Sequence, residues 1–102
     1  MARRRIFYII KVMPVIKLTS AFRSYTQGLL EIPVPAHTVG DAMHSLVKQY
    51  PSLQPHLYNS QGALRPYVNL FLGEENIKNL QGLDTPLGEM DVLRLVPSVA
   101  GG

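Results

Sequence analysis

The sequence contains no cysteine. Disulfides, thiolate metal sites and a side-chain thiol nucleophile are therefore excluded. Three histidines, His37, His44 and His56, lack the spacing of metal ligands, and Glu74 and Glu75 are the only adjacent carboxylates. No catalytic triad, phosphate-binding glycine loop or Schiff-base lysine is recognisable. We expect no metal site, no bound cofactor and no self-sufficient enzyme.

Long hydrophobic runs are also missing. The run at residues 6–10 is too short for a membrane span or a signal peptide, and Lys11 interrupts it. We expect residues 1–12 to be a disordered extension, an added edge strand or the product of an upstream start codon, with the domain beginning at Met13. The chain is expected to be cytoplasmic and to have no membrane partner.

Neither positive nor negative charge predominates in residues 13–102. The net charge of +3 comes from 10 Lys/Arg and 7 Asp/Glu, but four of the cations precede Met13. Residues 13–102 therefore carry six cations and seven anions, which is a net charge of −1. Because no basic stripe with interleaved aromatic residues is present, we expect no nucleic-acid partner.

A length of 102 residues, with 46% apolar and 17% charged residues, is typical of one globular domain. Alternating apolar residues predict strands at 15–19, 29–34, 65–72 and 91–96, and a short strand around Ile77. Pro33 indicates that the second strand lies at an edge of the sheet. The segment 80–87 is predicted to be a loop with buried leucines.

A helix that begins after Thr38 and ends before Pro51 is the clearest local feature. Thr38 is a favourable N-cap residue, and Asp41 places a carboxylate at the positive end of the helix. A hairpin, one helix and further strands, with the last strand parallel to the first, make an α+β fold of the β-grasp type. A ferredoxin-like topology would need a second full helix, which the glycine- and proline-broken stretch 79–91 does not supply.

The sequence ends in Gly101-Gly102, soon after the last predicted strand. Glycine has no Cβ, so such an end can enter a channel too narrow for other residues and present its carboxylate there. Pro97 is expected to end the strand, because it cannot donate a ladder hydrogen bond. The six residues 97–102 are then a flexible tail with a reach of roughly 20 Å. The Gly102 carboxylate is the candidate reactive group, and an inert frayed terminus is the alternative.

Several segments in combination resemble the ThiS/MoaD family of ubiquitin-like sulfur carriers. The likeness spans residues 14–102, and its length and Arg-Pro-Tyr-Val-Asn segment are most similar to the small subunit of molybdopterin synthase and to the carrier used in cysteine synthesis. Carriers of the thiamine pathway are usually shorter. The matching segments are Thr38-Val39-Gly40-Asp41-Ala42, Leu64-Arg65-Pro66-Tyr67-Val68-Asn69, Gly73-Glu74-Glu75-Asn76-Ile77, Gly82-Leu83-Asp84-Thr85-Pro86-Leu87 and Leu95-Val96-Pro97-Ser98-Val99-Ala100-Gly101-Gly102.

The resemblance implies a specific chemistry at the terminus. In that family a ubiquitin-activating-type enzyme uses ATP to adenylate the terminal glycine, and sulfur then replaces the adenylate to give a thiocarboxylate. The thiocarboxylate attacks a substrate held by an acceptor synthase subunit. On this sequence Gly102 would react, Val99, Ala100 and Gly101 would form the tail, and ATP would be used by the activating enzyme.

The outward residues of two neighbouring strands are a candidate partner surface. If the helix covers the opposite face, Tyr67, Asn69, Phe71, Arg94 and Val96 form an exposed patch beside the tail. Phe71 and Val96 are the expected main contacts for the activating enzyme and the acceptor, and Arg94 is expected to pair with an acidic partner residue. The alternative is that the N-terminal extension or a loop covers this patch.

Three functions remain open from the sequence. The first is a sulfur carrier for molybdopterin, cysteine or thiamine synthesis. The second is a protein modifier joined through Gly102 to lysines of other proteins, which uses the same adenylation but ends in an isopeptide bond. The third is a β-grasp binding module with an inert tail. The first two need the same terminus and the same surface, so the sequence does not separate them.

Overall fold

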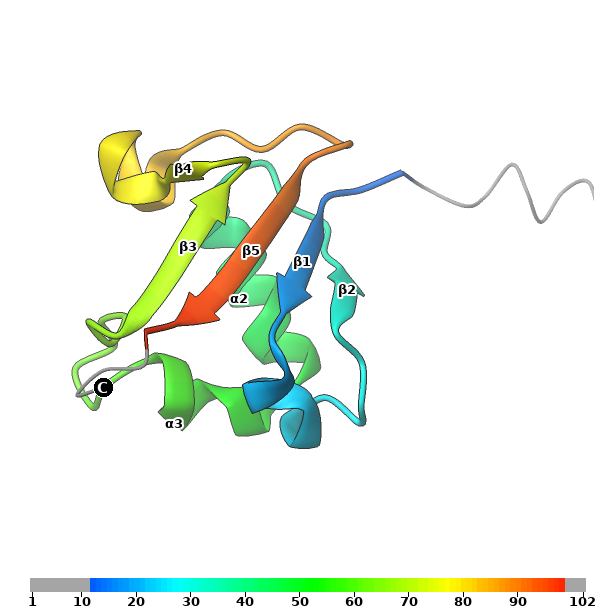
Figure 1. Cartoon of the computed structure of the whole chain (residues 1–102), viewed down its shortest axis with the longest axis vertical. Helices are drawn as coiled ribbons and strands as arrows, with labels where there is room; N and C mark the ends of the chain where they lie inside the picture. The colour runs from blue at the N-terminus through cyan, green and yellow to red at the C-terminus, as the bar shows by residue number, and fades with distance from the viewer. Residues whose placement is uncertain (1–11, 99–102) are drawn as a thin grey trace, which may run out of the picture.

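The computed structural model describes residues 12–98 of the chain. Five strands form one sheet in the order β2-β1-β5-β3-β4 (Figure 1). The elements, in which η denotes a 3₁₀ helix, are β1 (Val15–Leu18), η1 (Ser20–Tyr25), β2 (Glu31–Pro33), α2 (Val39–Gln49), η2 (Pro51–Leu53), α3 (Gln54–Leu57), β3 (Val68–Leu72), β4 (Glu75–Asn76), η3 (Ile77–Asn79), η4 (Gly82–Asp84) and β5 (Val92–Pro97).

The pairing of the strands confirms the predicted β-grasp fold of the α+β class. The first and last strands, β1 and β5, run parallel in the middle of the sheet, with Ile16 opposite Leu93. All other neighbouring strands are antiparallel. β2 lies at one edge of the sheet, as Pro33 predicted.

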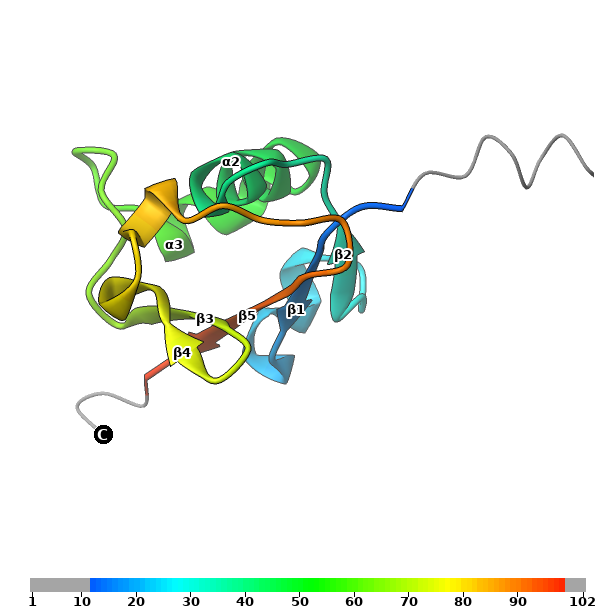
Figure 2. The same ribbon diagram turned by 90° about the horizontal axis from the view of Figure 1, so that it is seen from above.

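The helix α2 and the short helix α3 lie on the same side of the sheet, so the domain has two layers (Figure 2). The N-cap of α2 is formed as predicted, because the backbone N–H of Asp41 donates to Oγ1 of Thr38 at 3.1 Å. The helix turns Val39, Ala42, Met43 and Leu46 toward the sheet, and all four side chains are fully buried. Burial of this apolar stripe, more than helix propensity, stabilises α2.

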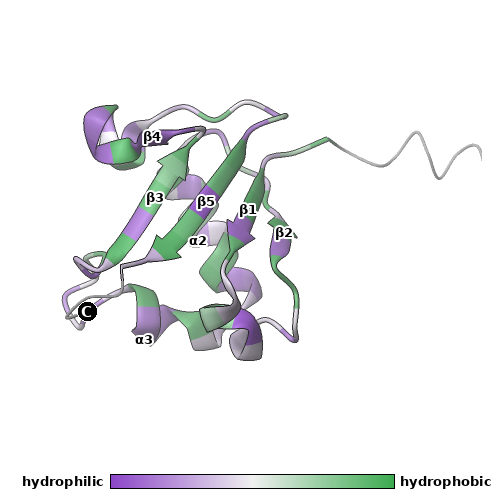
Figure 3. Ribbon diagram, viewed as in Figure 1, coloured by the Kyte–Doolittle hydropathy of each residue, from purple (hydrophilic) through white to green (hydrophobic). Residues whose placement is uncertain are grey.

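Hydrophobic stretches of β3 and β5 are interrupted by hydrophilic residues (Figure 3). Successive side chains of a strand point to opposite faces, and the buried ones lie in the core between the two layers. Leu93 and Leu95 of β5 are both fully buried, whereas Arg94 between them is exposed. Seventeen buried apolar residues form the core: Ile16, Leu18, Phe22, Ile32, Val34, Val39, Ala42, Met43, Leu46, Leu53, Leu57, Val68, Leu70, Ile77, Leu87, Leu93 and Leu95.

The prediction that the leucines of segment 80–87 are buried is wrong for two of the three. Leu80 and Leu83 are each 43% exposed, and only Leu87 is buried. Leu80 lies at the end of η3, and Leu83 lies in the 3₁₀ turn η4. The Oγ1 of Thr85 holds η4 by donating to the carbonyl of Gly82 at 2.7 Å. The segment packs tightly on the start of α2, where a Cβ on Gly40 would lie 3.2 Å from the backbone oxygen of Leu83.

Several predicted strand boundaries also move by one to three residues, and β2 covers only Glu31–Pro33 of the predicted 29–34. β3 begins at Val68 rather than at residue 65, because the N–H of Val68 donates to the carbonyl of Arg65 in a turn at 3.0 Å. The short strand around Ile77 is β4, which ends before that residue. The side chain of Asn76 accepts from the N–H of Lys78 at 2.9 Å, which starts a 3₁₀ turn in place of a longer strand.

Candidate functional site

The predicted reactive residue, Gly102, and the predicted tail residues Val99, Ala100 and Gly101 lie outside the described residues. The structure does describe where the terminal segment leaves the domain. That point is the end of β5, next to the start of β3.

β5 continues one residue past Val96, where the sequence placed the end of the domain, and includes Pro97. Pro97 lies opposite Val68 of β3, whereas β1 has already ended at Leu18, which lies opposite Leu95. The missing N–H of Pro97 therefore removes no hydrogen bond from the β1·β5 ladder. This central strand tolerates proline because its neighbour on one side is shorter.

Ser98, the last described residue, is bound to the domain through both of its donors. Its backbone N–H donates to the carbonyl oxygen of Tyr67 at 2.7 Å. Its hydroxyl donates to the same oxygen at 3.2 Å. The side chain of Tyr67 is in turn held, because its hydroxyl donates to the carbonyl of His56 on α3 at 3.3 Å.

The structure brings four of the five predicted partner residues together on the face of the sheet that points away from α2. The fifth, Tyr67, lies outside the strands, and its hydroxyl donates to the carbonyl of His56 on α3. Phe71 lies opposite Arg94, and Asn69 lies opposite Val96, across the β3·β5 ladder. Tyr67 precedes β3 and is 38% exposed. Within residues 12–98, α2 and α3 both lie on the opposite side of the sheet (Figure 2). The patch therefore adjoins the point where the terminal segment begins.

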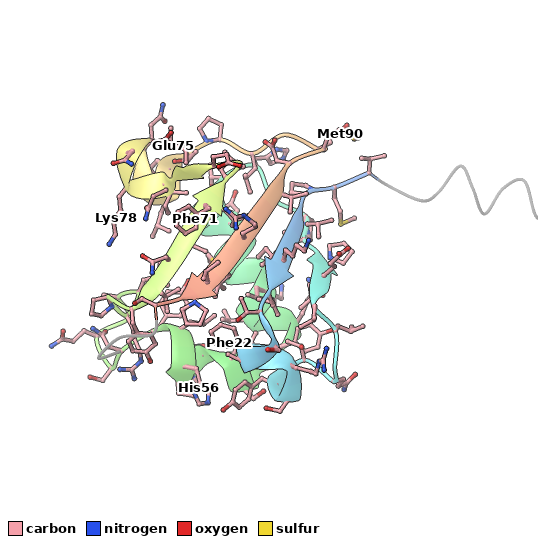
Figure 4. All side chains as sticks on the ribbon, viewed as in Figure 1. Phe22, His56, Phe71, Glu75, Lys78 and Met90 are labelled. Carbon is pink, nitrogen blue, oxygen red and sulfur yellow. The ribbon has the colours of Figure 1, made fainter. Side chains whose placement is uncertain are left out.

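Arg94 is engaged within the domain. Its Cζ lies 5.2 Å from the centroid of the Phe71 ring, a cation–π geometry. Its Nη2 also donates to the carbonyl of Gly73 at 3.3 Å. Figure 4 shows Phe71 on β3 beside β5. Phe71 is only half-buried, so the patch offers a partly shielded aromatic ring with a cation over it.

Lys17 is a residue of this face that sequence reasoning missed. The strand register places Lys17 beside Arg94 on β5 and beside Glu31 on β2. Two neighbouring cations thus lie at the centre of the sheet, although the domain as a whole is not basic. With Glu31 beside Lys17, the three side chains carry a net charge of +1, which favours an anionic contact at this surface. Only the pairing of β1 with β5, which are far apart in sequence, reveals it.

A hollow lies at the other end of the sheet. It is an open groove of about 570 Å³ that includes Pro14, Pro35, His37, Leu87 and Glu89. Pro14 precedes β1, Leu87 and Glu89 precede β5, and Pro35 and His37 follow β2, whose end lies opposite the start of β1. The terminal segment begins at the other end of β5. The six residues of β5 span roughly 20 Å. The groove therefore does not adjoin the point where the terminal segment begins.

Between residues 12 and 98, no group of three or more His, Cys, Asp or Glu side chains could hold a metal ion. No helix in that range is long and apolar enough to cross a membrane. Burial raises the pKa of the Tyr58 phenol. His56 stacks on Tyr25, with ring centroids 4.2 Å apart.

Comparisons with known proteins agree with this arrangement. The ThiS family model matches residues 16–102. The sulfur carrier protein CysO of Mycobacterium tuberculosis is 26% identical over 89 residues, which cover 85% of this chain and 96% of that protein. The solution structure of small archaeal modifier protein 1 from Methanosarcina acetivorans has a TM-score of 0.77 at 28% identity, covering 87% of this chain and 95% of that chain.

A fourth similarity concerns the fold alone. A chain in the crystal structure of the Amycolatopsis orientalis BexX/CysO complex has a TM-score of 0.77 at 20% identity. The match covers 87% of this chain and 99% of that chain. In that structure a domain of this shape is bound to another protein.

Proposed function

The chain belongs to the ThiS family, and from this we propose that it is a sulfur carrier, a protein co-substrate whose Gly102 carboxylate is activated and then bears the sulfur. The observation that carries the proposal is the extent of the family match. It runs from the first strand to Gly102 and so includes both the β-grasp domain and the terminal glycines.

The chemistry begins with activation of the carboxylate. A carboxylate is a poor electrophile, so one of its oxygens attacks the α-phosphorus of ATP on a ubiquitin-activating-type enzyme, and pyrophosphate leaves. A sulfide-level nucleophile then attacks the carbonyl carbon, and AMP departs with one of the original carboxylate oxygens. The thiocarboxylate that results has a soft anionic sulfur, which is the reactive form for attack on an electrophilic substrate.

The domain supplies the surface that brings the terminus to its partners. The patch of Phe71, Asn69, Val96, Tyr67 and Arg94 adjoins the base of the terminal segment, so a partner that covers it stands beside the tail. Half-buried aromatic and apolar residues at such a position give contact area, and the cations favour an acidic partner. We propose that the activating enzyme and an acceptor synthase subunit use this surface in turn.

Two relatives inform the choice of partner. CysO is named as a sulfur carrier, and a CysO–BexX assembly has been crystallised. An acceptor of the cysteine, molybdopterin or thiamine type is therefore proposed for this chain. The cognate acceptor would hold the electrophile that the terminal sulfur attacks.

A protein modifier is the second candidate function. The likeness to small archaeal modifier protein 1, at 28% identity, favours it specifically. In that case the acyl-adenylate ends in an isopeptide bond between Gly102 and a lysine amine of another protein.

Intact-mass measurement separates the two functions. The full chain is incubated with ATP, a sulfur donor and the organism's own ubiquitin-activating-type enzyme, with a chain lacking Gly102 as the matched control. A carrier gains the mass of an oxygen-to-sulfur exchange at Gly102, and the control gains nothing. Conjugates of higher mass on cellular proteins would support the modifier. An unchanged mass in both assays would contradict both functions and favour a plain binding module.

A further inference from the structure

Ser98 extends the β3·β5 pairing by one residue through its N–H and adds a side-chain contact to the same carbonyl. Ser98 is exposed, so water could satisfy both its N–H and its hydroxyl. Instead, both donors converge on one carbonyl oxygen, at 2.7 Å from the N–H and 3.2 Å from the hydroxyl. A carbonyl oxygen has two lone pairs, so Ser98 occupies the full acceptor capacity of Tyr67.

Tyr67 is itself held from the other side. Its hydroxyl donates to the carbonyl of His56 at 3.3 Å, which ties it to α3. The next residue of α3, Leu57, is fully buried in the core. The base of the terminal segment is thus joined to the packed layer of the domain through Tyr67, as well as to β3 through the sheet.

We propose that this contact, the tail anchor, sets the reach of the terminal segment, and that Ser98 is a positioning residue for the reaction at Gly102. The inference rests on the proposed function and deepens it. With Ser98 held, four residues remain, Val99 to Gly102, and their extended reach is roughly 13 Å. A segment beginning at Pro97 would reach roughly 20 Å.

The tail anchor therefore restricts the kind of partner that the chain serves. The reacting atom of the activating enzyme, the α-phosphorus of ATP, must lie within about 13 Å of Ser98 along a channel. The anchor also removes conformational freedom at the start of the segment before binding, so less is lost when the tail enters the channel. Its effect is expected on the KM for the carrier, whereas kcat depends on groups at Gly102.

The test measures ATP–pyrophosphate exchange by the organism's own activating enzyme, with the full chain as substrate. Ser98→Pro removes both donors, and we expect KM to rise about fivefold, the change expected for loss of a net exposed hydrogen bond, at unchanged kcat. Ser98→Ala keeps the N–H and should have a smaller effect. Ser98→Thr keeps both donors and should match the wild type.

Shortening the tail in the wild type and in Ser98→Pro tests whether Ser98 sets the reach of the tail or only stabilises the fold. Deletion of Val99 shortens the segment by about 3.3 Å and should lower kcat/KM about 100-fold in the wild type, since misplacement of a reacting atom by an ångström can cost that much. In the Ser98→Pro background the same deletion should cost only about tenfold, because release of residue 98 returns the lost length. Val99→Ala, which keeps the length, is the matched control and should have little effect.

Three results would overturn the inference. Equal costs of the Val99 deletion in both backgrounds would show that Ser98 does not set the reach. A lower melting temperature for Ser98→Pro that accounts for its loss of activity would assign Ser98 a purely structural role. Absence of ATP–pyrophosphate exchange with the wild-type chain would overturn the proposed function as well. If the wild type is active but the effects of Ser98→Pro and the Val99 deletion on kcat/KM are additive, only the tail anchor is overturned.

Discussion

Replacement of Arg94 separates the internal role of this side chain from its proposed role at a partner surface. Within the domain Arg94 lies over the Phe71 ring at 5.2 Å and donates to the carbonyl of Gly73 at 3.3 Å. At an exposed site the cation–π contact contributes about 0.5–1 kcal/mol, and a long, exposed hydrogen bond adds little to that. We expect Arg94→Ala to lower the free energy of unfolding by about 1 kcal/mol, which is a melting-temperature decrease of roughly 4–8 °C for a domain of this size.

The expected effect on partner binding is of a different kind. Arg94→Glu reverses the charge beside Lys17 and places a carboxylate where an acidic partner residue is expected. Association with the activating enzyme should slow by about tenfold or more at low salt, and the difference from the wild type should shrink as salt is added. Arg94→Lys, which keeps the charge but not the planar group, is the control and should bind nearly as well as the wild type.

Surface plasmon resonance over a salt series measures this effect, and urea denaturation measures stability on the same samples. Wild-type association rates for Arg94→Glu at low salt would refute the assignment of this face to an acidic partner. A weakened Arg94→Glu whose deficit does not change with salt would show that shape, and not charge, governs the contact. A loss of stability much larger than 1 kcal/mol for Arg94→Ala would mean that the contact with Phe71 is worth more than its exposed geometry indicates.

Three further predictions concern the terminus, the core and the buried phenol. Deletion of Gly102 should abolish adenylation in the pyrophosphate-exchange assay and leave the melting temperature nearly unchanged, and a large loss of stability would count against a separate tail. Leu93→Ala should destabilise the domain by about 2–5 kcal/mol in urea, because Leu93 is fully buried, whereas the exposed Val92→Ala should cost less than about 1 kcal/mol. Burial raises the pKa of Tyr58, so its neutral form is favoured in the folded state. That contribution is complete below the unfolded pKa of about 10 and is lost as the pH rises through the folded pKa. The wild type should therefore lose more stability than Tyr58→Phe between about pH 9 and about pH 11, and equal losses would contradict the assignment.

The features that the sequence predicted correctly are those that depend on neighbouring residues. Apolar alternation with a period of two identified β1, β3 and β5, because successive side chains of a strand point to opposite faces. Thr38 and Pro51 marked the ends of α2, because capping and proline act within one turn. Pro33 correctly indicated an edge strand. The resemblance that connected these segments with the Gly-Gly end also led to the family.

Errors arose where a turn decides the direction of a side chain. Leu80 and Leu83 are apolar, and the sequence predicted them to be buried, yet Leu80 at the end of η3 and Leu83 in η4 are both exposed. The hydroxyl of Thr85 holds η4, and the space left by Gly40 admits it against α2. The sequence shows that a residue is apolar, but it does not show whether a short turn directs its side chain toward the core or toward solvent.

The sequence by itself predicted the main strands, the helix α2 and most of their buried faces, and its resemblance led to the family. Only the tertiary structure placed Lys17 beside Arg94 and bound Ser98 to Tyr67. Both arrangements join residues far apart in the chain, such as positions 67 and 98, through strand register. Register is set by the packing of the whole sheet on α2, since a slip of one residue would turn every buried side chain of a strand to the solvent.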